Sequence, residues 1–126
     1  MQITLDSPPG APQPLGPYSQ VARMELPGGG VLLQLSGQIA EGADLATQSR
    51  RVLEAIDALL KAHGATLGDV VNIRSYLTDI SRLSEYGAVR KEFFPGTPPT
   101  STTVEVSRLF RPEALIEVEV LAAIGA

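Results

Sequence analysis

The sequence predicts one α+β domain in which two helices pack on one face of a mixed sheet. Short segments alternate apolar and polar residues with the period of a strand, and two longer segments repeat apolar residues every three or four positions. With 126 residues, the chain has the length of a single domain, residues 1–126. Two helices cannot cover both faces of a wide sheet, so one face is expected to stay open to water or to a partner.

The first third of the chain is expected to form three strands and a proline-rich loop. Residues 2–5 alternate polar and apolar, whereas residues 6–17 carry five prolines, which remove backbone donors and favour an ordered loop. Residues 21–26 and 31–35 have the composition of strands, and the glycines between them predict a hairpin. No helix and no Gly-Lys-Ser/Thr follows these glycines, so they do not match a phosphate-binding loop.

The rest of the chain predicts two helices and three strands. Apolar residues recur along one side of residues 43–63, and Gly64 is expected to end this helix. The second helix is expected at residues 81–94, before the prolines that begin at Pro95. The strands are expected at residues 70–77, 102–107 and 116–122, and in the first of them one face should carry Val71, Ile73, Ser75 and Leu77.

Composition excludes several classes of site. The chain has no cysteine, and His63 is its only histidine, so thiolate chemistry and multi-histidine metal sites are excluded and no metal site is expected. The net charge of −4 disfavours nucleic acid as a partner, because phosphate binding depends on clustered Lys and Arg. No apolar run approaches the ~20 residues of a membrane span, and no basic-then-apolar leader precedes the first strand, so we expect a cytoplasmic protein without a membrane partner. His63 itself is explained by the C-terminal end of the first helix, which favours a cation.

Two glutamates on the last strand are the clearest candidates for chemistry. Glu117 and Glu119 are two residues apart, which places them on one strand face about 6–7 Å from each other. Such carboxylates can act as an acid–base pair if burial raises one pKa, or they can simply form a solvated polar face. Arg74 lies on the polar face of its own strand and is a possible cation for the same cleft.

Four segments of the chain resemble the RidA/YjgF family of small imine and enamine deaminases, which is also named the endoribonuclease L-PSP family. They are Gly16-Pro17-Tyr18-Ser19-Gln20, Ser36-Gly37-Gln38-Ile39, residues 99–109 and Ile116-Glu117-Val118-Glu119, in the family's order. The resemblance implies a chorismate-mutase-like fold and a homotrimer whose three sheets close into a barrel. It also implies a pocket between subunits and hydrolysis of the imine by water without any cofactor.

The resemblance assigns roles to individual residues. Glu119 stands at the position of the acid that activates water and is the expected catalytic residue, while Tyr18, Ser36 and Gly37 are expected to line the pocket. Ser101 stands where catalytic members carry the arginine that binds a substrate carboxylate, so Ser101 and Thr103 offer hydroxyl groups instead. The family's usual asparagine of the second helix aligns with Gly87. These departures indicate a divergent subgroup.

The sequence therefore predicts a RidA-like deaminase that converts small reactive imines or enamines to carbonyl compounds and ammonia, with an imine, an enamine or a keto acid as its ligand. The alternative is a trimer that binds a small metabolite without catalysis. A ribonuclease, the third possibility, is disfavoured by the acidic charge balance.

Overall fold

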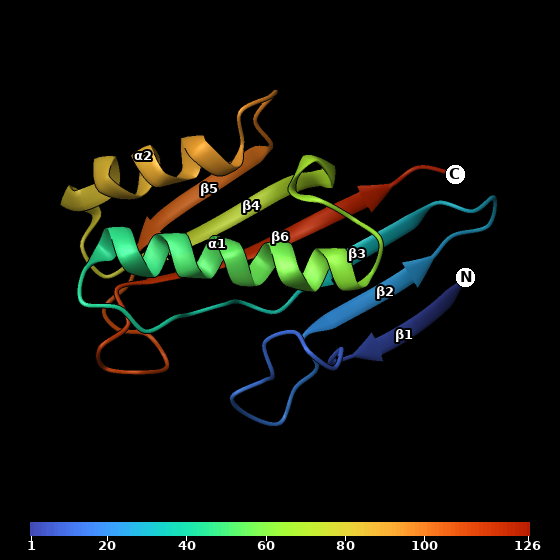
Figure 1. Cartoon of the computed structure of the whole chain (residues 1–126), viewed down its shortest axis with the longest axis horizontal. Helices are drawn as coiled ribbons and strands as arrows, with labels where there is room; N and C mark the ends of the chain where they lie inside the picture. The colour runs from blue at the N-terminus through green and yellow to red at the C-terminus, as the bar shows by residue number, and fades with distance from the viewer.

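The computed structural model describes all residues, 1–126, as six strands and two α-helices (Figure 1). Two short 3₁₀ turns, Leu67–Asp69 and Ile80–Arg82, precede β4 and α2. The elements follow one another as β1 (Gln2–Asp6), β2 (Val21–Glu25), β3 (Val31–Leu35), α1 (Leu45–Ala62), β4 (Val70–Leu77), α2 (Leu83–Phe93), β5 (Thr100–Glu105) and β6 (Ile116–Ile124).

All six strands form one mixed sheet in the order β1-β2-β3-β6-β4-β5. Every neighbouring pair is antiparallel except β4 and β5, which are parallel and are connected through α2. The last strand, β6, is inserted between β3 and β4 and therefore lies in the interior of the sheet. The predicted mixed sheet is confirmed.

Both helices lie on the same face of the sheet, as predicted (Figure 1). α1 crosses the middle strands, and α2 lies alongside β4 and β5. The apolar stripe expected for α1 is buried against the sheet, because its spacing follows the helical period. Its buried residues are Leu45, Gln48, Ser49, Val52, Leu53, Ile56, Leu59 and Leu60.

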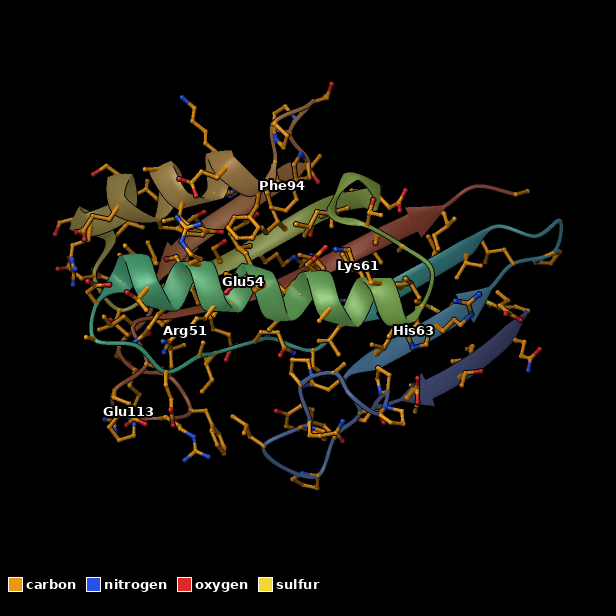
Figure 2. The ribbon with its side chains drawn as sticks, in the orientation of Figure 1. Arg51, Glu54, Lys61, His63, Phe94 and Glu113 are labelled. Carbon is orange, nitrogen blue, oxygen red and sulfur yellow. The ribbon has the colours of Figure 1, made fainter.

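The ends of α1 are set by local hydrogen bonds. The Asp44 carboxylate accepts a hydrogen bond from the Thr47 backbone N–H, so the helix begins at Leu45 rather than at residue 43. Gly64 follows the end of the helix with a φ of +79°, a conformation that costs glycine little. At the same end of α1 lies His63 (Figure 2). Its ring lies 2.9 Å from Asp6 Oδ2, which ties α1 to β1 in addition to the favourable helix dipole.

The remaining boundaries differ from the predicted ones for identifiable reasons. Val71 was expected to share a strand face with Ile73 but is exposed, because a bulge in the pairing of β4 with β6 turns Val70 inward instead. α2 begins at Leu83, since Asp79 caps a 3₁₀ turn through Ser81 first. β5 begins at Thr100, two residues earlier than expected, because Thr100 already pairs with Asn72 of β4. The hairpin at Gly28 and Gly29 is confirmed, with φ values of +95° and +98°.

The face of the sheet opposite the helices is uncovered. Strand register divides it into an apolar part over β1 to β3 and a polar part over β4 to β6. The apolar part carries Ile3, Leu5, Ala22, Met24 and Leu32, and the polar part carries Arg74, Tyr76, Thr102, Glu117 and Glu119. Neither helix combines the length and the apolar character that crossing a membrane requires.

Candidate functional site

The two glutamates of β6 lie on the uncovered face of the sheet, as their spacing predicted. In the antiparallel pairing of β6 with β4, Glu119 is opposite Arg74 and Glu117 is opposite Tyr76. Directly opposite residues on one face have their side chains within reach of each other. The structure therefore brings the candidate acids and the candidate cation Arg74 onto one polar patch.

Glu119 is held by a neighbouring tyrosine. The Tyr76 hydroxyl donates a hydrogen bond to Glu119 Oε1, and this bond to a carboxylate is the main reason why the pKa of Tyr76 is raised. Glu119 also lines a hollow of about 500 Å³, together with Arg74 and Ser36. A half-buried carboxylate in a fixed orientation, beside an open hollow and a cation, is suited to binding a polar ligand or to transferring a proton.

Glu117 lies in a second, smaller hollow of about 170 Å³. Tyr18, Gly37, Gln38 and Phe110 line it as well. Burial removes the Glu117 carboxylate from water and raises its pKa, and the charge of Glu119 adds to the effect. The raised pKa expected for one member of the pair therefore belongs to Glu117, which holds its proton more firmly than an exposed glutamate does.

Gly37 lies directly against the Glu117 carboxylate, which a side chain at this position would displace. A Cβ atom at position 37 would lie 2.6 Å from Glu117 Oε2 and 2.8 Å from its Cδ, closer than such atoms approach in proteins. The absence of a side chain thus makes room for the carboxylate. The predicted pocket residue Gly37 is placed beside one of the predicted acids.

Hydrogen bonds attach the loop that carries Tyr18 to the end of β3 and also fix the conformation of the loop itself. Ser36 Oγ donates to the Ser19 carbonyl over 2.7 Å, and the Tyr18 hydroxyl accepts from the Leu15 backbone N–H over 3.0 Å. Tyr18 lines the smaller hollow and Ser36 lines the larger one, and their polar groups also hold the loop in place.

Two glutamines that sequence reasoning did not select form the base of this region. Gln20 and Gln38 are both buried, and Gln38 Nε2 donates to Gln20 Oε1 over 2.8 Å. Buried amides of this kind must be paired, because an unpaired buried polar group is costly. Both glutamines belong to the segments that carry the resemblance, Gly16-Pro17-Tyr18-Ser19-Gln20 and Ser36-Gly37-Gln38-Ile39, which was the signal available in the sequence.

Ser101 and Thr103 are not part of either hollow. They pair with Ile73 and Ser75 of β4, whose side chains are buried beneath the helices, so they face the helix side of β5 at the edge of the sheet. Glu119 faces the opposite side. Within one chain, the structure does not bring the two expected hydroxyl residues to the carboxylates.

An arginine occupies the space beside Ser101. Arg90 of α2 donates from Nη1 to Ser101 Oγ over 2.9 Å. Sequence reasoning did not select Arg90, although it lies three residues after Gly87 and therefore on the same side of α2. The edge of the sheet thus has a cation of its own, distinct from Arg74.

Fold and site together define a small α+β protein with carboxylates in two hollows on an uncovered sheet face. A model of the family described as Endoribonuclease L-PSP matches residues 9–124. The chain is 41% identical over 120 residues to a RutC family protein of Saccharolobus solfataricus, covering 89% of this chain and 90% of that protein. It therefore belongs to the endoribonuclease L-PSP family, also called the YjgF or RidA family, which confirms the resemblance.

Solved structures agree with this assignment. A member of the YjgF/YER057c/UK114 family from Mycobacterium tuberculosis has a TM-score of 0.83 and 34% sequence identity, over 98% of this chain and 100% of that one. The structure of TdcF from Escherichia coli, determined with bound serine, has a TM-score of 0.84 and 29% identity, over 97% and 99% of the two chains. The predicted fold is confirmed.

The titratable side chains of the uncovered face differ in their surroundings. No group of three or more His, Asp or Glu side chains is close enough together to hold a metal ion. The groups that the site does offer are two carboxylates in different environments, one tyrosine hydroxyl and one arginine. Carboxylates whose environments differ in this way can divide the acid and base roles of a reaction.

Proposed function

We propose that the protein is a cofactor-free deaminase that hydrolyses small imines or enamines to carbonyl compounds and ammonia. The observation that carries the proposal is the position of Glu119 in this chain, which belongs to the family. Tyr76 holds Glu119 in the hollow that Arg74 and Ser36 also line. A cytoplasmic site of action, expected from the composition, is part of the same proposal.

The reaction needs only water and a group that carries a proton. Water attacks the imine carbon, and Glu119 accepts the proton that the attacking water loses. Glu119 returns this proton to the nitrogen, which gives a carbinolamine. It then accepts the proton of the carbinolamine hydroxyl and passes it to the nitrogen, so that the C–N bond breaks, ammonia leaves and the carbonyl forms. Each imine thus consumes one water and releases one ammonia, and a positioned carboxylate accelerates such transfers by roughly 10²–10⁴-fold.

A homotrimer is also part of the proposal. The uncovered sheet face has an apolar part containing Ile3 and Leu5, which are 60% and 68% exposed in the isolated chain. An exposed apolar face beside the open edges β1 and β5 favours association. Association also explains why Ser101 and Glu119 face opposite sides of one sheet, since a pocket between subunits can combine them.

Imine hydrolysis by the wild-type protein is the direct test. Imines are generated in the cuvette by an amino-acid oxidase acting on a panel of neutral amino acids, and ammonia release is followed with and without the protein. We expect release faster than the uncatalysed rate for at least one member of the panel. No acceleration for any imine would overturn the proposal.

A second candidate function is binding of a small keto acid without catalysis. Ser101 at the position of the expected arginine is the observation that favours it. Stabilisation of the protein by pyruvate in a thermal shift assay, together with no imine hydrolysis, would select this function. A ribonuclease is the least favoured function, because both hollows are lined by glutamates and the net charge is −4.

A further inference from the structure

Arg90 on α2 carries a guanidinium without an acidic partner. None of the ion pairs in the structure includes it, whereas Arg23, Arg50 and Arg82 each pair with a glutamate. Arg90 donates a hydrogen bond to the neutral Ser101 hydroxyl, over 2.9 Å, and also interacts with the Tyr86 hydroxyl. Both of these partners are neutral, so the charge of Arg90 is not compensated by a neighbouring carboxylate.

The guanidinium is nevertheless held in place. Its central carbon lies 5.9 Å from the centre of the Tyr86 ring, within the range of a cation–π contact. Tyr86 is buried, and its hydroxyl is hydrogen-bonded to Ser75 Oγ of β4 over 2.6 Å, so the ring has a fixed position. Arg90 is thus supported by α2 on one side and by the β5 hydroxyl on the other.

The surface next to Arg90 is open. Gly87 lies one turn earlier on the same side of α2. A Cβ atom at Gly87 would meet no atom within 4 Å, so no side chain covers this part of the helix. A small ligand can therefore approach the guanidinium from the side of Gly87, with the Ser101 hydroxyl beside it.

The helix dipole alone does not explain this arrangement. Lys91 also lies in the last turn of α2 and satisfies the same preference for a cation. A preference for charge near the helix end does not require contacts to a tyrosine ring and to the hydroxyl of β5. A fixed guanidinium with free donors and open space in front of it is the arrangement that binds a carboxylate with two parallel hydrogen bonds.

We propose that Arg90, with the Ser101 hydroxyl, forms a carboxylate-binding subsite that selects imines and keto acids bearing a carboxylate. The proposal rests on the proposed function and names the substrate class of that site. It makes Arg90 a specificity-determining residue and leaves proton transfer to the carboxylates of the uncovered face.

Binding is measured first, because it does not require catalysis. Pyruvate and its uncharged amide are titrated against wild type, Arg90→Gln, Arg90→Lys and the control Lys91→Gln, which removes one charge from the next position of α2. We expect Arg90→Gln to weaken pyruvate binding by about ten- to a hundredfold and to leave the amide unaffected. The affinity of Arg90→Lys for pyruvate should lie between those of wild type and Arg90→Gln, since a lysine keeps the charge but lacks the planar guanidinium. Lys91→Gln should bind pyruvate like wild type.

Turnover is compared on a matched pair of imines. Oxidation of leucine gives an imine with a carboxylate, and oxidation of 3-methylbutylamine gives one with the same side chain and no carboxylate. Arg90→Gln should lose activity on the first by about ten- to a hundredfold and keep that on the second. Melting temperatures of all variants show whether each is folded.

The outcomes separate the two proposals. If wild type hydrolyses neither imine but binds pyruvate through Arg90, the deaminase fails and the subsite stands. If Arg90→Gln is folded and binds pyruvate as wild type does, the subsite is overturned. It is also overturned if Arg74→Gln abolishes the preference for pyruvate while Arg90→Gln does not, or if wild type binds neither ligand.

Discussion

The two faces of the sheet carry different polar groups. On the uncovered face, β6 and β4 present Glu117 and Glu119 with Tyr76. At the β5 edge on the helix face, Arg90 and Ser101 present a cation and a hydroxyl group. The carboxylates suit proton transfer and the arginine suits anchoring, but the sheet itself lies between them.

The support of the two regions differs as well. Glu119 is positioned from a neighbouring strand by Tyr76, so the register of β4 and β6 fixes it. Arg90 is positioned by packing between α2 and β5, through Tyr86 and Ser101. The proposed proton-transfer group is thus built into the sheet, whereas the position of the cation depends on how α2 packs on the sheet. We therefore expect that substrate choice can change without altering the carboxylates proposed for catalysis.

The largest expected effect is on the uncovered face. Glu119→Gln keeps the size and the hydrogen bond to Tyr76 but cannot carry a proton, so imine hydrolysis should fall by roughly 10²–10⁴-fold. Steady-state rates on both matched imines measure it. Tyr76→Phe serves as the matched variant, because it removes the hydroxyl that positions Glu119, and it should cost about tenfold. Equal rates for Glu119→Gln and wild type would assign proton transfer to another group, with Glu117 the first to examine.

Mixed trimers test whether the two faces meet between subunits. Glu119→Gln and Arg90→Gln chains are each impaired on the leucine imine, but a cyclic trimer of both contains sites that combine an intact glutamate with an intact arginine. After co-refolding at equal amounts, about a quarter of the sites should be complete in a random cyclic trimer. Activity near a quarter of wild type would support the arrangement. If the activity of the mixture does not exceed the summed activities of the two separate variants, the arrangement between subunits is contradicted. A single species near 13.3 kDa in sedimentation would also contradict it.

The sequence predicted the elements more completely than the site. Period-two and period-3.6 patterns depend on local burial, and the buried face of α1 with Val52 and Ile56 follows them closely. Val71 was misplaced because a bulge is a property of strand pairing. Arg90 was missed because its contact with Ser101 joins α2 to β5 across eleven residues, and nothing in the spacing marks it. The raised pKa of Glu117, which burial causes, likewise depends on how the loop with Gly37 folds over β6.

A smaller effect is expected when the arginine is placed at position 101 instead of position 90. The sequence alone suggests that Ser101→Arg should improve turnover of 2-aminoacrylate, which carries a carboxylate. In the structure, this arginine would be placed against Arg90, and two cations ~4 Å apart repel by about 1 kcal/mol in water. We therefore expect Ser101→Arg alone to raise turnover of 2-aminoacrylate only slightly. Ser101→Arg combined with Arg90→Gln should raise this turnover by up to about tenfold more. A larger gain from the single variant would show that Arg90 does not occupy the site during turnover.

The smallest expected effect concerns stability and separates Glu117 from Glu119. Burial raises the pKa of the Glu117 carboxyl in the folded protein, while in the unfolded chain it is about 4.3. The folded state therefore binds this proton more tightly, and the stability that Glu117 contributes is fully present below about pH 4.3 and is lost as pH rises through the higher folded value. Glu117→Gln cannot ionise, so its melting temperature relative to wild type should rise between pH 4 and pH 7. Glu54→Gln, at an exposed position of α1 (Figure 2), removes the same charge and should show no such rise. A difference between Glu117→Gln and wild type that stays constant over this range would show that the buried hollow does not hold a proton on Glu117.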